Sequence, residues 1–196
     1  SMSVVNSLYN FQLIRFSGED GVAAYGTIMY VNFFFAAVFF GYSIGSAPVI
    51  GYHYGAGNHD ELKNLFKKSL SLIAVWGILL TLLAHLLAAP LAAVFVGYDK
   101  ELFAMTCRGF RLYSLSFLMM GVNVWGSGFF TALNNGTISA AISFLRTFLF
   151  QVSMVLLLPT FLGIDGIWLA IVAAELLAFG ITAVFLIVMG KRYHYA

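Results

Sequence analysis

The stretch Ile167–Gly190, IWLAIVAAELLAFGITAVFLIVMG, decides the fold class, because Glu175 is its one charged residue. A helix needs about 20 mostly apolar residues to cross the hydrocarbon core of a bilayer. The stretch is continuously apolar, whereas the strands of a membrane barrel alternate over about ten residues. It therefore predicts a transmembrane α-helix that carries a carboxyl group in its interior.

The rest of the chain has the same character. Of its 196 residues, 61% are hydrophobic and 9% are charged, against about 25% charged residues in a soluble domain. A net charge of +2 with no long basic patch argues against a nucleic-acid partner. A single cysteine, Cys107, excludes an internal disulfide. The composition predicts an all-α polytopic membrane protein whose surroundings are the lipid bilayer.

Turn-forming segments rich in Gly, Asn and Asp divide the chain into a bundle of about six helices, of which the first is truncated. The expected ranges are 1–16, 22–52, 62–96, 103–133, 137–161 and 165–190. Pro48 and Pro90 fall inside the second and third of these ranges, and each predicts a helix kink.

Basic residues predict the orientation in the membrane. If the second and third helices connect on the inside, Lys63, Lys67 and Lys68 share that side with Lys191 and Arg192. The bias favours a cytoplasmic C-terminus in the cell membrane. The terminal run of residues 191–195, KRYHY, is typical of an anchor at the membrane interface.

Polar residues recur along the predicted helices at helical spacing. A polar group that faces lipid is costly, so these residues are expected to face one another or a wet cavity. The alternative is that small polar residues only pack the helices together. The candidates for lining a cavity are Asn10, Asn32, Tyr113, Asn123, Arg146, Gln151 and Trp168.

Arg146 and Glu175 are the two charged residues expected deepest in the membrane. Arg146 has a long side chain that can reach the interface, whereas a carboxylate has little reach. Glu175 can be a neutral acid, can pair with a cation or can face water. Because ionisable groups at such depth are functional by default, Glu175 is the candidate residue for ion coupling.

One motif suggests an enzyme instead. Gly41-Tyr42-Ser43-Ile44-Gly45 matches the G-x-S-x-G pattern of serine hydrolases, and an intramembrane serine protease would pair Ser43 with His85. The motif lies within an apolar helix, so we interpret Gly41 and Gly45 as a G-x-x-x-G packing face. With no P-loop and no zinc-protease motif, neither a nucleotide nor a metal cofactor is expected.

Several segments together resemble the multidrug and toxic compound extrusion (MATE) transporters in order and spacing. They are GEDGVAAY at 18–25, GSAPVIGYHYGAGN at 45–58, FFTALNN at 129–135, SFLR at 143–146, LP at 158–159 and GIDGIW at 163–168, followed by Glu175. MATE transporters have two lobes of six helices, and this chain is similar to the second lobe, from partway through its first helix.

The resemblance implies a transporter and not an enzyme. It implies efflux of cationic or amphipathic drug-like compounds in exchange for sodium ions or protons, by alternating access of the two lobes. The N-terminal lobe of the same polypeptide is the implied partner. Several members carry an acid in the helix that matches Tyr113–Phe130, but this chain has none there, which leaves Glu175 as the candidate.

Two other functions stay open at this stage. A flippase for lipid-linked saccharides would bring basic residues to its cavity, because such substrates carry phosphates; the candidates are Arg15, Arg108, Arg111 and Arg146. A structural assembly subunit would have no polar cavity between its helices.

Overall fold

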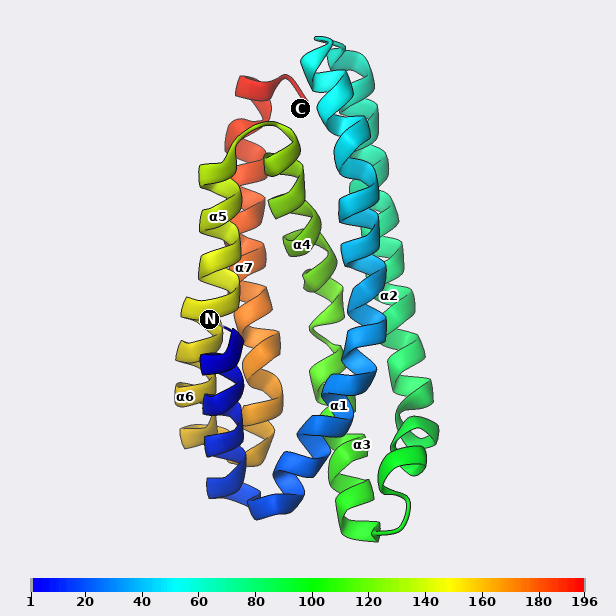
Figure 1. The fold of residues 1–196 in the computed structure, drawn as a ribbon, viewed down its shortest axis with the longest axis vertical. Coiled ribbons are helices and arrows are strands. Elements are labelled where there is room, and N and C mark those ends of the chain that lie inside the picture. The colour runs from blue at the N-terminus through cyan, green and yellow to red at the C-terminus, as the bar shows by residue number, and fades with distance from the viewer. Residues whose placement is uncertain (1, 196) are drawn as a thin grey trace.

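The computed structural model describes residues 2–195, apart from the side chain of Met2, and these residues form an elongated helical bundle (Figure 1). Every regular element in the described range is helical, as the sequence predicts. The elements are α1 (Met2–Gly55), α2 (His59–Val96), α3 (Lys100–Ser114), α4 (Phe117–Ala132), α5 (Gly136–Phe144), the π-helix η1 (Leu145–Phe150), α6 (Gln151–Leu162) and α7 (Ile164–Tyr193).

Helix α1 is an elbow with two legs. Its backbone leaves the helical region at Gly18, where φ is 62° and ψ is −147°, a conformation that essentially only glycine adopts. The first leg, residues 2–17, turns back beside α6 (Figure 1), where the Gln12 amide nitrogen donates to the carbonyl of Val155 at 3.1 Å. The break predicted between the first two helices therefore lies at Gly18.

Short polar side chains start the helices at the predicted turns. Asn58 accepts a hydrogen bond from the backbone of Glu61 at the start of α2, and Asp99 accepts from Glu101 and Leu102 at the start of α3. Asn135 does the same for Ile138 in α5. These side chains satisfy backbone N–H groups that have no partner in the first turn of a helix.

Two predicted helices are interrupted. The segment expected at 103–133 is a bent pair, in which α3 and α4 meet at 48°. The segment expected at 137–161 contains the π-helical turn of η1 between α5 and α6. Pro48 and Pro90 both lie inside continuous helices, and the non-helical residue of α1 is Gly18 and not Pro48.

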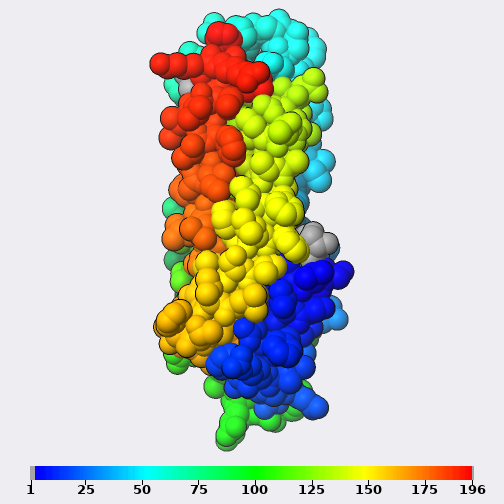
Figure 2. Space-filling model, turned by 90° about the vertical axis from the view of Figure 1, so that its left-hand side faces the viewer, coloured from blue at the N-terminus to red at the C-terminus, as the bar shows by residue number. Residues whose placement is uncertain are grey.

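Helix α4 is central and packs against α1, α2, α5 and α7. Its aromatic residues Phe117, Trp125 and Phe129 are fully buried. A hydroxyl cluster joins α4 to α5, with the Ser127 oxygen 2.9 Å from that of Ser139 and 2.8 Å from that of Ser143. On the face in Figure 2, the segment that runs from α5 through η1 to α6 lies between α7 and the first leg of α1.

The G-x-x-x-G interpretation is wrong within this lobe. A Cβ built on Gly41 or Gly45 meets no described atom within 4 Å, so this face packs against none of the described helices.

Four helices in the described range are long and apolar enough to span a membrane, and the bent pair of α3 and α4 adds a fifth if it counts as one span. Their outward surface carries large apolar side chains such as Leu86 and Phe161. The chain is an integral membrane protein in its architecture.

The end of the chain returns to the turn between α1 and α2 (Figure 1). The rings of His59 and His194 have centroids 4.7 Å apart, as do those of Phe66 and Tyr195. Tyr195 is fully buried, and its hydroxyl donates to the carbonyl of Leu186 at 2.8 Å. The expectation of an interface anchor is therefore wrong for Tyr195, because aromatic packing draws this ring into the bundle.

Candidate functional site

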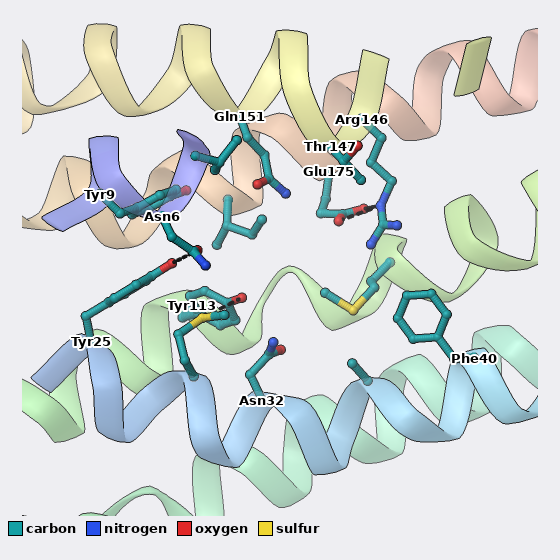
Figure 3. Close-up of a pocket in the computed structure, with 15 residues that line it drawn as sticks. Asn6, Tyr9, Tyr25, Asn32, Phe40, Tyr113, Arg146, Thr147, Gln151 and Glu175 are labelled. Atoms are coloured by element: carbon teal, nitrogen blue, oxygen red, sulfur yellow. Dashed lines mark hydrogen bonds and ion pairs between the residues drawn. The ribbon is translucent and has the colours of Figure 1, made fainter. Parts of the chain in front are cut away.

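A polar cavity of about 170 Å³ lies between the two legs of α1 and the helices that face them (Figure 3). Its wall is mixed, with methionine and aliphatic side chains among polar ones. The polar lining residues are Asn6, Tyr9, Tyr25, Asn32, Tyr113, Arg146, Thr147, Gln151 and Glu175. A purely structural subunit is expected to have no polar cavity between its helices, so this cavity argues against that function.

A buried ion pair forms one wall of the cavity. The Arg146 Nε donates to Glu175 Oε1 at 2.8 Å and to Oε2 at 3.0 Å. The side-chain amide of Asn123 donates to Glu175 Oε2 at 2.7 Å and to the Glu175 carbonyl at 2.9 Å. The Glu175 side chain is fully buried and the Arg146 side chain is 11% exposed. Burial of a charge is tolerated here because it is paired and hydrogen-bonded.

The π-helical turn places two of the lining residues. In η1 the backbone follows the i→i+5 pattern of a π-helix, and Arg146 and Gln151, five positions apart, both line the cavity. Such turns are rare and occur frequently at functional sites. Thr147 sits in the same turn, and its hydroxyl donates to the carbonyl of Ser143 at 2.6 Å.

Three tyrosines face the cavity with weakly satisfied hydroxyls. Tyr25 donates to Asn6 Oδ1 at 3.4 Å, and Tyr113 donates to the sulfur of Met29 at 3.8 Å. The buried hydroxyl of Tyr9 has no hydrogen-bond partner among the described residues, although its ring stacks on that of Tyr25 with centroids 5.1 Å apart. Sulfur is a weak acceptor, and an O–H···O bond of 3.4 Å is long.

Not all of the predicted residues reach this cavity. Asn32, Tyr113, Arg146 and Gln151 line it together with Glu175. Asn10 lines instead a neighbouring groove of about 650 Å³ at the elbow of α1.

Two of the expected cavity residues lie elsewhere, and the expectation is corrected for both. Asn123 is fully buried behind Glu175, to which its amide nitrogen donates two hydrogen bonds. Trp168 is buried in the core, where it packs over Gly109, a glycine whose added Cβ would lie 2.9 Å from the indole.

The polar lining residues that the candidates omitted are Asn6, Tyr9, Tyr25 and Thr147. Asn6 and Tyr9 are three residues apart on the first leg, which places them on one helix face. That spacing is the signal available in the sequence. Their approach to Tyr25 depends on the elbow at Gly18, which brings the two legs together.

The geometry does not form a serine protease. The Ser43 hydroxyl donates to the carbonyl of Val124 at 3.4 Å, whereas His85 Nδ1 lies 2.9 Å from the carbonyl of Thr81 and 3.2 Å from the hydroxyl of Ser114. A nucleophile and its base must be within hydrogen-bond reach. No group of three or more metal-ligating side chains occurs within residues 2–195.

The four arginines considered for a flippase do not converge. Arg108 pairs with Asp165 at 2.8 Å through Nε, and Arg15 lies over the ring of Phe16. Arg111 is exposed. Arg146 is the one arginine of the described chain that lines the cavity, and it is paired. Among the described residues, Arg146 alone brings a cationic side chain to the cavity, which is fewer than the several basic residues expected for a flippase.

Apolar helices that enclose a polar cavity with a deep ion pair are typical of membrane transport proteins, in which ionisable groups at this depth mark ion and substrate pathways. The family model MatE matches residues 1–157, and the chain belongs to this family. No curated protein sequence matches the chain.

Solved structures of transporters share the fold. A crystal structure of MATE in complex with MaL6 has a TM-score of 0.90 at 18% identity, over 100% of this chain and 44% of that chain. An inward-facing multidrug resistance MATE family transporter of the MOP superfamily has a TM-score of 0.90 at 19% identity, over 98% of this chain and 44% of that chain.

The Vibrio cholerae MATE transporter VcmN in its bent form is also similar, with a TM-score of 0.87 at 19% identity, over 99% of this chain and 44% of that chain. The chain thus spans less than half the length of each of these three transporters. These likenesses show that the chain shares the fold of the MATE transporters named here.

Proposed function

We propose that this chain forms one lobe of an ion-coupled secondary transporter, which exports amphipathic compounds in exchange for sodium ions or protons. One observation carries the proposal: the wall of the polar cavity contains the buried pair of Glu175 and Arg146. Glu175 is the coupling residue. The other acidic residues of the sequence lie in turns, near helix ends or in the first elbow.

The pair supplies a physical basis for coupling. Both oxygens of Glu175 already accept hydrogen bonds from Arg146 and Asn123. An incoming proton or sodium ion therefore competes with the guanidinium group for the carboxylate. Breaking a buried pair is expensive, so ion binding favours a conformation in which Arg146 finds another partner.

The N-terminal lobe of the transporter is supplied by the same polypeptide, and the basic residues near Lys63 and Lys191 face the cytoplasm. The cavity of about 170 Å³ is smaller than the roughly 300–1,000 Å³ of sites for drug-sized ligands. A substrate cleft between two lobes extends this cavity. Met29 and Met120 in its wall give adaptable apolar surface for varied substrates.

The test uses the full polypeptide that contains this lobe, reconstituted into liposomes. Transport of ethidium and of carboxyfluorescein is followed under a sodium gradient alone and under a proton gradient alone, with protein-free liposomes and an ionophore as controls. The proposal expects one of the two gradients to drive transport of at least one probe. Rates that neither gradient changes for either probe would contradict it.

A further inference from the structure

The cavity holds a surplus of hydrogen-bond donors without strong acceptors. The hydroxyl of Tyr9 has no partner in the described part of the chain, and those of Tyr25 and Tyr113 have only a long bond and a bond to sulfur. A buried polar group without a good partner destabilises the folded protein. Three such hydroxyls in one cavity favour a ligand that brings acceptor atoms.

Arg146 adds charged donors to this set. Its Nε is bound to Glu175, but no described residue accepts from its two terminal nitrogens. Figure 3 shows these nitrogens turned away from Glu175 and toward the cavity. The amide of Gln151 and that of Asn32 also line the cavity, and each can donate.

The acceptor side of the cavity is much weaker. The carboxylate of Glu175 is occupied by Arg146 and Asn123, so it offers little to a positively charged ligand. The side-chain amide oxygens of Asn32 and Gln151 are neutral acceptors in the described lining, and that of Asn32 has no partner there. A cation that enters the cavity therefore meets the open side of a guanidinium group, whereas an anion meets its donors.

The groove at the elbow of α1 adjoins the cavity and has a different chemistry. It shares Asn6, Tyr25 and Met29 with the cavity, so the long hydrogen bond between Tyr25 and Asn6 lies between the two spaces. Its other walls include Phe33 and Phe34, whose rings are largely exposed. No charged side chain from the described part of the chain lines it. A flat aromatic body fits this surface.

We propose that this lobe recognises aromatic compounds with an anionic end such as a carboxylate. The carboxylate binds the terminal nitrogens of Arg146 and the tyrosine hydroxyls in the cavity, and the ring lies in the groove on Phe33 and Phe34. The inference rests on the proposed function, because it names the substrate class of the same cavity.

The test compares three ligands that share one ring: 2-naphthoate, the neutral 2-naphthamide and the cationic 2-naphthylmethylammonium. Their affinities for the full polypeptide in lipid nanodiscs are measured by calorimetry at neutral pH, without any ion gradient. Hydrogen bonds to charged groups predict that 2-naphthoate binds about tenfold more tightly than the amide, with the ammonium compound weakest. Tightest binding of the ammonium compound would overturn the proposal.

Two variants isolate Arg146. Glu175→Gln leaves the guanidinium without its counterion, so 2-naphthoate binds at least as tightly as to the wild type. In the double variant R146Q/E175Q, which removes both charges together, the preference for 2-naphthoate over the amide falls to about one. A preference that survives in the double variant would overturn the assignment of Arg146.

A third comparison locates the ring. Phe34→Ala is expected to weaken all three ligands by a similar factor, whereas Phe161→Ala, at another exposed phenylalanine in α6 outside the groove, leaves them unchanged. Equal affinities in wild type and Phe34→Ala would overturn the placement of the ring. Because no gradient is present, loss of coupled transport would contradict the proposed function alone and leave these ratios intact.

Discussion

The guanidinium Nε of Arg146 lies 2.8 Å from Oε1 and 3.0 Å from Oε2 of Glu175, at a wall of the polar cavity. The two deep charged residues thus neutralise each other across η1 and α7. Asn123 in α4 fixes the carboxylate from a third element. Three parts of the lobe meet at one carboxyl group, so a change in its charge state reaches all of them.

Because Arg146 and Glu175 form a buried pair, the effects of substituting each of them on the free energy of unfolding are expected not to add. Arg146→Gln leaves Glu175 buried without its countercharge and is expected to cost about 3–5 kcal/mol. The double variant R146Q/E175Q removes both charges and is expected to cost clearly less than the sum of the single changes. Thermal and denaturant unfolding of the full polypeptide in nanodiscs measures this. Additive losses would mean that the two side chains are not coupled.

Replacing Gly18 at the elbow of α1 is expected to lower the free energy of unfolding through backbone strain and not through a steric clash. A Cβ at this position meets no described atom within 4 Å, but φ is 62°. Gly18→Ala is therefore expected to lose about 1–3 kcal/mol of unfolding free energy.

Gly45→Ala is the matched control for the elbow, because Gly45 has the same open surroundings in a helical conformation. It is expected to be neutral or stabilising. Equal effects of the two changes would show that the elbow carries no backbone strain.

Substitutions of the buried Tyr195 at the end of the chain are expected to lower the free energy of unfolding, by more when more of the side chain is removed. Tyr195→Phe removes the hydrogen bond to the carbonyl of Leu186 and is expected to cost about 1 kcal/mol. Tyr195→Ala also empties the space between Phe66 and Phe129, at about 3–5 kcal/mol.

Unfolding measurements on both variants test this, with Tyr98→Ala at an exposed tyrosine as the control. A Tyr195→Ala variant as stable as Tyr98→Ala would contradict the packing of the chain end.

The sequence predicts the class of fold and most helix breaks for local reasons. Gly18, Asn58, Asp99 and Asn135 act through their own backbone or the next turn, which a sequence displays directly. The bend between α3 and α4 falls at Leu115–Ser116, where neither proline nor glycine signals it. Tertiary packing sets such a bend, so the pattern of residue types does not reveal it.

The sequence predicts only part of the candidate site, and tertiary structure again explains the residues that it misplaces. Helical spacing identifies a polar face but assumes the regular α-helical repeat, and η1 departs from that repeat exactly where Arg146 lies. Asn123 and Trp168 have suitable side chains at suitable spacings for lining a cavity. However, Asn123 binds Glu175, and Trp168 packs on Gly109, each on another helix. Contacts between distant segments decided which of these residues face the cavity.

The role of Glu175 in coupling is tested most directly by one transport measurement on the full polypeptide in liposomes. The wild type is compared with Glu175→Gln and with Asp165→Asn, the acid of the exposed pair with Arg108 near the start of the same helix. We predict that Glu175→Gln still exchanges substrate but is no longer accelerated by the driving ion gradient, whereas Asp165→Asn responds as the wild type does. Undiminished acceleration of Glu175→Gln by the gradient would contradict the account.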